Sequence, residues 1–495
     1  TRADFDFDRG SNAAATRIGS DGLLKKYQEN LLLQSNNFGT TWGNSNTTET
    51  GGQADKDGGT DAWLLTKSAG NGYLIQSLTL AGVQTASIYA KAGDSDWIYV
   101  QAVGTSTTSC YFDLVNGTTS SGGSLIDKSI ELIGNGWYRC SITYNQTLSN
   151  LRIYPAESNS VSATSGSIYI QSAQVETSLV ATDYLNSTSV TAKAGVLIDL
   201  PRINYDANGE NGALLLEPSR QQLFPNSEFF GVGTGDWISY GGQSIATNST
   251  ISPEGFKNAT KLTDTGGVYN QVVYNPNINY VFSVFAKTDT STSITMNFVD
   301  QAAGYLGGSI KYTFATGATS VILQSANGSV TADKEDYGNG WIRVILKFTT
   351  NAAQNYNYQQ IDFQGGDGWI FGTQLEPNAS YATSYIPNHG TSGGVTRAAD
   401  VNTLSNAISL DGDFALFWEG AVLEDDVMLY GSGTNAWYMN YSTSTGGIIL
   451  DELSGRKVQA FLGSGTATGV KTKILIKRVS GVHNVFANAT KLTNI

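Results

Sequence analysis

The chain contains one unit twice, and this repeat limits the folds that it can adopt. Gly134–Arg139 reads Gly-Asn-Gly-Trp-Tyr-Arg, and Gly338–Arg343 reads Gly-Asn-Gly-Trp-Ile-Arg. Apolar and polar residues alternate after each copy, which is the pattern of a β-strand with one buried face. The Asn-Gly pair in front of each strand is typical of a tight turn. The repeat therefore indicates two copies of a domain built from antiparallel strands.

Other blocks match in the same order, about 200 residues further along the chain, which is longer than a solenoid repeat and indicates domain duplication. The matched pairs include Ile88–Lys91 with Val284–Lys287, Gln174–Glu176 with Gln374–Glu376, and Ala181–Tyr184 with Ala382–Tyr385. We predict a first module at residues 1–193 and a second at 194–397, each opening with a hairpin. Residues 398–495 read as part of a third β module that continues past Ile495.

The composition favours an all-β fold. Charged residues make up 14% of the 495 residues, the hydrophobic content is 40%, and there are 56 glycines. The apolar positions are filled mostly by β-branched and aromatic residues, which favour strands over amphipathic helices. Many short strands between Gly-, Asn- and Ser-rich turns are typical of antiparallel sandwiches.

The charge balance excludes one class of partner. The net charge of −13 argues against a nucleic-acid-binding protein, because a phosphate-binding surface needs a basic stripe. No apolar run approaches the length of a membrane span, so we expect no membrane insertion.

Three blocks carry a family resemblance: Glu29–Ser35, Pro201–Arg220 and Gln374–Arg397. They resemble bacteriophage virion appendage proteins, the fibre, spike and head-decoration proteins with tandem carbohydrate-binding-module-like jelly rolls. The segment Phe414–Trp418 looks like the early strand of a concanavalin-like, laminin-G-type sandwich. The resemblance implies tandem antiparallel jelly-roll β-sandwiches followed by the start of a third, concanavalin-like sandwich. It also implies a homotrimer on the virion surface that contacts other virion proteins and host-surface glycans.

Candidate catalytic residues are scarce. The two histidines, His389 and His483, lie in different modules, each without a neighbouring ligand or triad partner. Paired carboxylates for glycoside hydrolysis cannot be singled out. We predict a non-enzymatic glycan-binding protein without a cofactor. The alternatives are a glycan-degrading tail spike and a purely structural spacer.

One loop is a candidate calcium site. Asp55, Asp57 and Asp61 place three carboxylates in one Gly-rich turn, and carboxylate oxygens are the ligands that Ca²⁺ prefers. A solvated Asp-Gly turn without an ion is the alternative.

The first copy differs from the second on one strand. If Ile98 and Val100 face the core, then Trp97, Tyr99 and Gln101 face outward. The corresponding strand of the second copy, Ser293–Phe298, carries small polar residues at its outward positions.

The next strand of the first copy adds to the same face. Cys110, Phe112 and Leu114 point inward by alternation, and Tyr111 and Asp113 outward. Clustered exposed aromatic residues indicate a contact surface, because flat rings stack on sugars while polar groups bind hydroxyls. Cover by a loop or a neighbouring chain is the alternative. The predicted carbohydrate-binding face consists of Trp97, Tyr99, Gln101, Tyr111, Asp113 and Arg139.

Other recurring residues are expected in the framework. We assign Trp137 and Trp341 to packing, and we keep a framework ion pair with Glu176 or Glu376 as an alternative role for Arg139 and Arg343. Cys110 and Cys140 are the only cysteines. Buried free thiols are expected for this pair, and a disulfide between them stays open.

Overall fold

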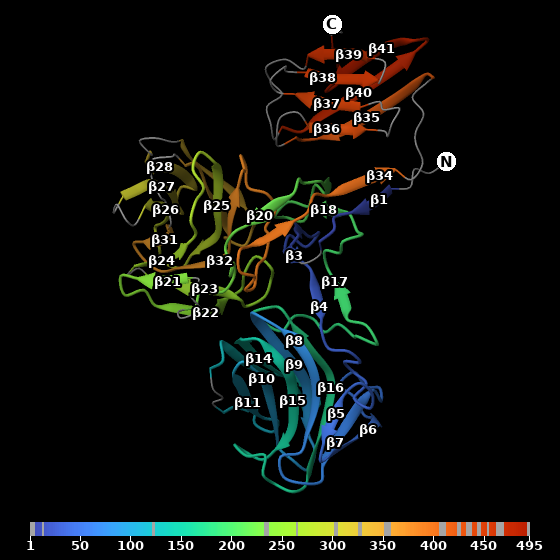
Figure 1. The fold of residues 1–495 in the computed structure, drawn as a ribbon, viewed down its shortest axis with the longest axis vertical. Coiled ribbons are helices and arrows are strands. Elements are labelled where there is room, and N and C mark those ends of the chain that lie inside the picture. The colour runs from blue at the N-terminus through green and yellow to red at the C-terminus, as the bar shows by residue number, and fades with distance from the viewer. Residues whose placement is uncertain are drawn as a thin grey trace. The chain divides into compact units, whose positions relative to one another are not determined.

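The computed structural model describes residues 5–11, 14–120, 124–231, 237–263, 266–300, 305–324, 329–350, 358–404, 412–422, 427–431, 438–442, 447–452, 455–461 and 470–492. These residues form strands and turns, with no helix among them, so the all-β prediction is confirmed (Figure 1). Consequently the described segments include no helix suited to crossing a membrane.

The chain divides into two compact units, Arg9–Asp400 and a second unit made of Thr1–Asp8 with Val401–Ile495. In the second unit β1 (Phe5–Asp8) pairs with β34 (Val401–Leu404). We expected residues 1–193 to form one module, whereas β1 belongs with the C-terminal part. Pairing between strands nearly 400 residues apart leaves no mark on local periodicity, so the sequence did not show it.

The first sandwich consists of two six-stranded antiparallel sheets. One sheet, in spatial order, contains β12 (Thr118–Thr119), β11 (Thr107–Asp113), β10 (Trp97–Gly104), β15 (Leu148–Ala156), β8 (Tyr73–Leu80) and β5 (Gly43–Ser45). The other contains β13 (Asp127–Gly134), β14 (Trp137–Asn145), β9 (Val83–Ala92), β16 (Gly166–Glu176), β7 (Ala62–Lys67) and β6 (Thr47–Gln53).

The second sandwich repeats this arrangement strand for strand. Its first sheet contains β28 (Ala318–Leu323), β27 (Tyr305–Thr313), β26 (Ser293–Asp300), β31 (Tyr358–Gln364), β24 (Gly267–Gln271) and β21 (Trp237–Tyr240). Its second sheet contains β29 (Val330–Asp336), β30 (Ile342–Thr349), β25 (Asn279–Thr288), β32 (Gly368–Pro377), β23 (Ala259–Leu262) and β22 (Ile245–Thr250). The predicted tandem sandwiches are therefore present.

Short two-stranded sheets flank the sandwiches. They pair β2 (Thr16–Ile18) with β3 (Leu24–Lys26), β4 (Gln28–Asn30) with β17 (Ala192–Ala194), β18 (Arg202–Asn204) with β19 (Ala213–Leu215), and β20 (Arg220–Gln222) with β33 (Val395–Arg397). The hairpins β2–β3 and β18–β19 are the ones expected to open each module.

The C-terminal unit contains two four-stranded sheets. They are formed by β35 (Phe414–Gly420), β40 (Thr472–Val479), β41 (Val482–Ala487) and β42 (Thr490–Lys491), and by β36 (Val427–Gly431), β37 (Tyr438–Ser442), β38 (Gly447–Glu452) and β39 (Gly455–Phe461). Its likeness to a concanavalin-type sandwich stays a prediction.

The repeated Gly-Asn-Gly-Trp segment makes a tight turn in both copies. Asn135 and Gly136 have φ angles of 52° and 78°, and Asn339 and Gly340 have φ angles of 51° and 81°. Asparagine and glycine are the residues that tolerate this left-handed region best. Trp137 and Trp341, which follow the turns, are both 1% exposed. They pack in the interior, as predicted.

A hydrogen-bonded contact between a glutamate, a threonine and an arginine also recurs in both sandwiches. Glu176 accepts a hydrogen bond from the amide of Thr182 (2.9 Å), and the Thr182 carbonyl accepts one from Arg139. In the second copy Glu376 and Arg343 hold Thr383 in the same way, at 3.1 Å and 2.7 Å. In each copy the arginine and the glutamate, for which an ion pair was the alternative expectation, both form hydrogen bonds with the same threonine. The recurrence of this contact identifies it as framework.

Buried charges tie together segments that are far apart in the chain. Glu217 lies 2.9 Å from both Arg202 and Arg397, and Asp400 pairs with Arg202 and, at 3.3 Å, with Arg9. Each of these side chains is at most 3% exposed. Removing one partner of such a network leaves a buried charge without its compensating charge, which is strongly destabilising.

We therefore expect Asp400→Ala to lower the free energy of unfolding by about 3–5 kcal/mol, because it leaves Arg9 and Arg202 without their shared carboxylate. Urea unfolding followed by tryptophan fluorescence measures the change. Asp289→Ala, which breaks a partly exposed pair with Lys261, is the control and should cost less than about 1 kcal/mol. Equal losses in the two variants would contradict the role assigned to the network.

Candidate functional site

Alternation along β10 and β11 places the side chains as the sequence indicates. Ile98, Val100 and Cys110 are at most 1% exposed and belong to the core of the first sandwich. Tyr99 and Tyr111, at the intervening positions, are partly exposed. The outer face of this sheet is therefore the face that carries the tyrosines.

Four tyrosines form a continuous line across this face, one from each of four neighbouring strands. Tyr111 of β11 and Tyr99 of β10 have ring centroids 4.1 Å apart. Tyr99 lies 5.2 Å from Tyr154 of β15, which lies 5.1 Å from Tyr73 of β8. We call these four residues the tyrosine row. Cross-strand register accounts for it, because Tyr99 lies directly opposite both Tyr111 and Tyr154.

Part of the surface of these rings is covered by contact with one another. Tyr99 and Tyr111 are stacked with an interplanar angle of 26°. A stack covers one flat face of each ring, so this pair offers a ligand less flat ring surface than two separate rings would. The sequence-based expectation of freely displayed flat rings is corrected to this extent.

Polar groups interleave with the row. The Gln101 amide donates to the Tyr99 hydroxyl at 3.1 Å and accepts from the Tyr154 hydroxyl at 3.0 Å. The Arg152 guanidinium lies over the Tyr73 ring, 4.9 Å from its centroid. Burial raises the pKa of both Tyr111 and Tyr154, so these phenols stay protonated as hydrogen-bond donors at neutral pH. The face thus combines phenols, an amide and a guanidinium.

Two other predicted residues lie at one end of this face, where Trp97 and Asp113 are directly opposite each other in the register. Trp97 is partly exposed. Asp113 is buried and accepts hydrogen bonds from the amides of Val115 and Asn116 and from the Asn116 side chain. Although burial opposes ionisation, these bonds hold the pKa of Asp113 below its ordinary value. Asp113 therefore organises the turn between β11 and β12.

Arg139 does not lie on this face. It belongs to β14, in the other sheet of the sandwich, where its guanidinium binds Ser87 and the Thr182 carbonyl and lies over the Tyr89 ring. Placing it with the tyrosines was wrong, because alternation fixes a side of the strand and not the sheet to which the strand belongs.

The proposed calcium loop is organised by backbone hydrogen bonds. The Asp55 carboxylate accepts from the amides of Asp57, Gly59 and Asp61 at 2.7–3.0 Å. These amides, that of Asp61 foremost, hold the pKa of Asp55 below its ordinary value. No cluster of three or more metal-ligating side chains occurs among the described residues. This geometry favours the Asp-Gly turn, and a calcium ion at Asp55, Asp57 and Asp61 stays a prediction.

Cys110 and Cys140 are both buried with free thiols. They come from opposite sheets, β11 and β14, and belong to the same core cluster. Burial raises the pKa of Cys110 to about 11 and raises that of Cys140 as well, which keeps both thiols protonated and unreactive.

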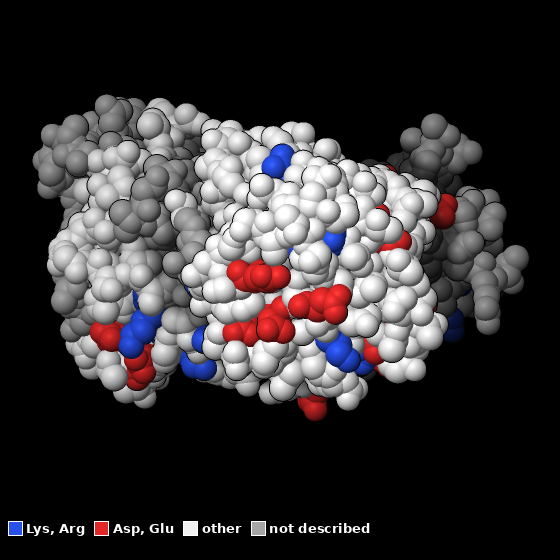
Figure 2. Space-filling model, turned by 90° about the horizontal axis from the view of Figure 1, so that it is seen from below, with Lys and Arg blue, Asp and Glu red and all other residues white. Residues whose placement is uncertain are grey.

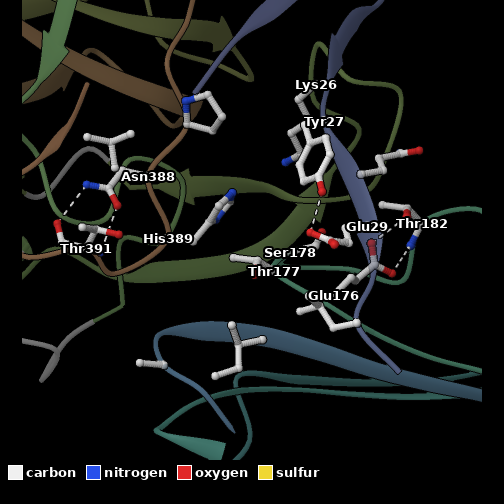
Figure 3. A pocket seen from close by; sticks show the side chains of 16 residues that line it. Lys26, Tyr27, Glu29, Glu176, Thr177, Ser178, Thr182, Asn388, His389 and Thr391 are labelled. Atoms are coloured by element: carbon white, nitrogen blue, oxygen red, sulfur yellow. Dashed lines mark hydrogen bonds between the residues drawn. The ribbon is translucent and has the colours of Figure 1, made fainter. Parts of the chain in front are cut away.

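A cavity of about 320 Å³ lies where the end of the first sandwich meets the segment after β32 (Figure 3). Its polar groups are engaged with one another: Tyr27 donates to Glu29 at 2.5 Å, and the Asn388 side chain bonds Thr391. Figure 3 shows His389 between these pairs. The pKa of His389 is lowered to about 3, chiefly by burial and to a lesser extent by the nearby Lys26 ammonium. No sequence pattern predicted this cavity, which closes only when segments distant in the chain meet.

Charged side chains are sparse on the face that Figure 2 shows. Figure 2 shows that the described atoms seen from below belong mostly to uncharged residues, with acidic and basic residues in small groups. No broad basic area is visible among the described atoms on that side. This agrees with a surface that interacts through neutral polar groups.

Comparison with known proteins does not identify a family. No family model matches the chain, and no curated protein matches it. Among solved structures, the tandem CBM22 pair of a Paenibacillus barcinonensis xylanase matches with 12% identity and a TM-score of 0.23, over 75% of this chain and 99% of that one. A CBM22–GH10 portion of a Clostridium thermocellum xylanase, complexed with xylohexaose, matches with 12% identity and a TM-score of 0.21, over 31% of this chain and 27% of that one. A Bacillus subtilis oxalate decarboxylase reaches a TM-score of 0.12 at 10% identity, over 74% of this chain and 79% of that one. Scores this low carry no argument about fold or function.

Sequence reasoning missed half of the tyrosine row. Tyr154 and Arg152 alternate with the core residues Leu151 and Ile153 on β15, in the same pattern that identified Tyr99. The signal was present on each strand, but the pairing of β10 with β15, and of β15 with β8, was unknown. Strand order was the missing information.

The raised phenol pKa values predict a pH dependence. In the unfolded chain Tyr111 and Tyr154 should titrate near the ordinary value of 10.0, whereas in the folded state they keep their protons to higher pH. Their contribution to stability is therefore complete below pH 10 and is lost as the pH rises further. Tyrosinate absorbance of the native protein should rise later than in urea, and Tyr154→Phe should remove one late-titrating phenol. Identical titration curves in the folded and unfolded states would contradict this.

Proposed function

We propose that the first sandwich binds a glycan, without cleaving it, through the tyrosine row on the outer face of the sheet that contains β10. The observation that carries this proposal is the unbroken line of Tyr111, Tyr99, Tyr154 and Tyr73 across four strands. Tyr154 is itself only 5% exposed, whereas Tyr111, Tyr99 and Tyr73 are partly exposed. A globular protein gains free energy by burying such rings, so the three rings that stay partly exposed indicate contact with a ligand.

The chemistry of the row suits a saccharide. Phenol hydroxyls and the Gln101 amide can exchange hydrogen bonds with sugar hydroxyls, and the Arg152 guanidinium adds further donors. The apolar ring edges, with the partly exposed indole of Trp97 at the end of the face, can contact the C–H surface of a pyranose. A ligand lying across the strands would meet the partly exposed tyrosines, Tyr111, Tyr99 and Tyr73.

The surroundings of the row support binding over hydrolysis. Cleaving a glycosidic bond requires two carboxyl groups about 5–9.5 Å apart on either side of the bond. Asp113 is the carboxylate predicted for this face, and the turn after β11 already occupies its oxygens. A glycan-degrading spike therefore finds no support in this part of the molecule.

One observation favours a second candidate function. The mutual stacking of Tyr99 and Tyr111 would also stabilise the sheet without any ligand, as expected of a structural spacer. The location on a bacteriophage virion, binding of a host-surface glycan and trimeric assembly come from the family resemblance and stay predictions.

Alanine substitution separates binding from structural support. We expect Trp97→Ala and Tyr99→Ala to stay folded and to weaken glycan binding at least about tenfold, equivalent to about 1.4 kcal/mol. A glycan array first identifies the ligand, and isothermal titration calorimetry then measures the affinity. Tyr169→Ala, at a partly exposed tyrosine of β16 in the opposite sheet, is the matched control and should bind normally.

The outcomes decide between the two candidates. Loss of binding with an unchanged unfolding midpoint supports a ligand face. Loss of stability in Tyr99→Ala, with no glycan retained even by the unsubstituted protein, supports the structural spacer.

A further inference from the structure

The first sheet of the second sandwich can be compared position by position with the sheet that carries the tyrosine row. Tyr99 and Thr295 lie the same distance along the chain after the matched blocks Ile88–Lys91 and Val284–Lys287. Their inward neighbours Ile98 and Ile294 are both fully buried. Thr295 therefore marks, in the second sandwich, the line that the tyrosine row follows in the first.

Along that line the residue types change. Thr295 lies opposite Lys311 of β27 on one side and Asp362 of β31 on the other. Asp362 lies opposite Gly267 of β24, which lies opposite Tyr240 of β21. The register thus puts a carboxylate where the first sandwich has Tyr154, and an ammonium where it has Tyr111.

The carboxylate is built into the face. Asp362 is 9% exposed and accepts hydrogen bonds from the Tyr240 hydroxyl and, at 3.3 Å, from the Asn297 amide. Tyr240 reaches it across Gly267, where an added Cβ would come within 2.4 Å of both the Asp362 carboxylate and the Ile361 carbonyl. Glycine is therefore needed at this crossing. Each carboxylate oxygen can accept a second hydrogen bond, so acceptor capacity remains for a ligand.

Aromatic rings border this carboxylate. Tyr269 of β24 lies 5.9 Å from Tyr240, at an interplanar angle of 49°, and 4.7 Å from Tyr358, nearly perpendicular at 83°. Tilted and perpendicular rings leave more flat surface uncovered than a stack does. The Gln360 side chain, directly opposite Tyr269 and partly exposed, adds an amide. The small polar residues expected at the outward positions of Ser293–Phe298 lie on β26, and the strands beside it carry larger side chains.

We propose that this face of the second sandwich, with Asp362 at its centre and Tyr240, Tyr269 and Gln360 around it, is a second ligand-binding face for a neutral, hydroxyl-rich saccharide. Asp362 accepts from sugar hydroxyls, Gln360 donates and accepts, and Tyr269 contacts the C–H side of the sugar ring.

The charges on this face of the second sandwich limit which ligands it attracts. Asp362 and Lys311 carry opposite single charges on the same line, so the face attracts neither a polyanion nor a polycation. The tyrosine row also has one charge of each sign at its edges, Arg152 over Tyr73 and Asp113 at the end of β11, but it has no carboxylate at its centre. The two sandwiches therefore present equivalent sheets with different side chains at equivalent places. The second face shares no residue with the tyrosine row, so either can fail without the other.

Affinity electrophoresis in native gels tests this face with three neutral polysaccharides as probes: a xylan, a β-glucan and a galactomannan. The full chain carrying Tyr99→Ala and Tyr111→Ala serves as background, so that any remaining retardation reports on the second face. Adding Tyr269→Ala or Asp362→Asn should then weaken retardation at least tenfold. Tyr381→Ala, at a partly exposed tyrosine outside both faces, is the control and should leave it unchanged. Gln360→Ala replaces Asp362→Asn if the latter fails to fold by near-UV circular dichroism.

Each result has one meaning. Retardation that persists in the background and disappears with Tyr269→Ala supports the second face. Retardation of the unsubstituted protein that is abolished in the background overturns the second face and leaves the tyrosine row intact. Retardation in the background that survives Tyr269→Ala and Gln360→Ala also overturns it. If the unsubstituted protein is retarded by none of the three probes, the second face is rejected, while an array hit on a charged glycan would still support the tyrosine row.

Discussion

Every strand of the two sandwiches must bury one side of its pleat, and this constraint determines what the other side can do. Ile98, Val100 and Cys110 lie in the interior of the first sandwich. Because side chains alternate along a strand, those of their sequence neighbours point to the outer face. Where those neighbours are small and polar, the sheet is simply hydrated. Where they are tyrosines at the same register on four adjoining strands, the pleat lines them up into one surface. The candidate binding site is thus a by-product of the same alternation that builds the core.

The duplication separates framework from function. Both copies keep the Asn-Gly turn, the buried tryptophan after it and the threonine shared between an arginine and a glutamate. These features close the sandwich and are needed in each copy. The outer faces are free of that requirement and have diverged, with Tyr154 in one and Asp362 in the other at equivalent places. The two sheets therefore share a geometry and differ in chemistry.

Buried charge plays a different part from the outer faces. Glu217 and Asp400 are shared among Arg9, Arg202 and Arg397, whose positions span nearly the whole of the Arg9–Asp400 unit. Such a network tolerates little change, because each charge depends on the others for its compensation in a place that water does not reach. It ties β18, which contains Arg202, to β33, which contains Arg397, without contributing a reactive group. The cavity beside His389 is likewise formed by structural contacts between distant segments.

The sequence by itself determined the strand content, the duplication and the side of each strand that faces the core, since all three follow from local periodicity and from matching blocks. It determined the outward direction of Tyr99 and Tyr111 for the same reason. Only the tertiary structure decided which strands adjoin. The strand order places Tyr154 and Tyr73 in the row, Arg139 in the opposite sheet and Asp362 beside Tyr240. Strand order depends on pairing between residues far apart in the chain, and alternation along a single strand carries no information about its neighbours.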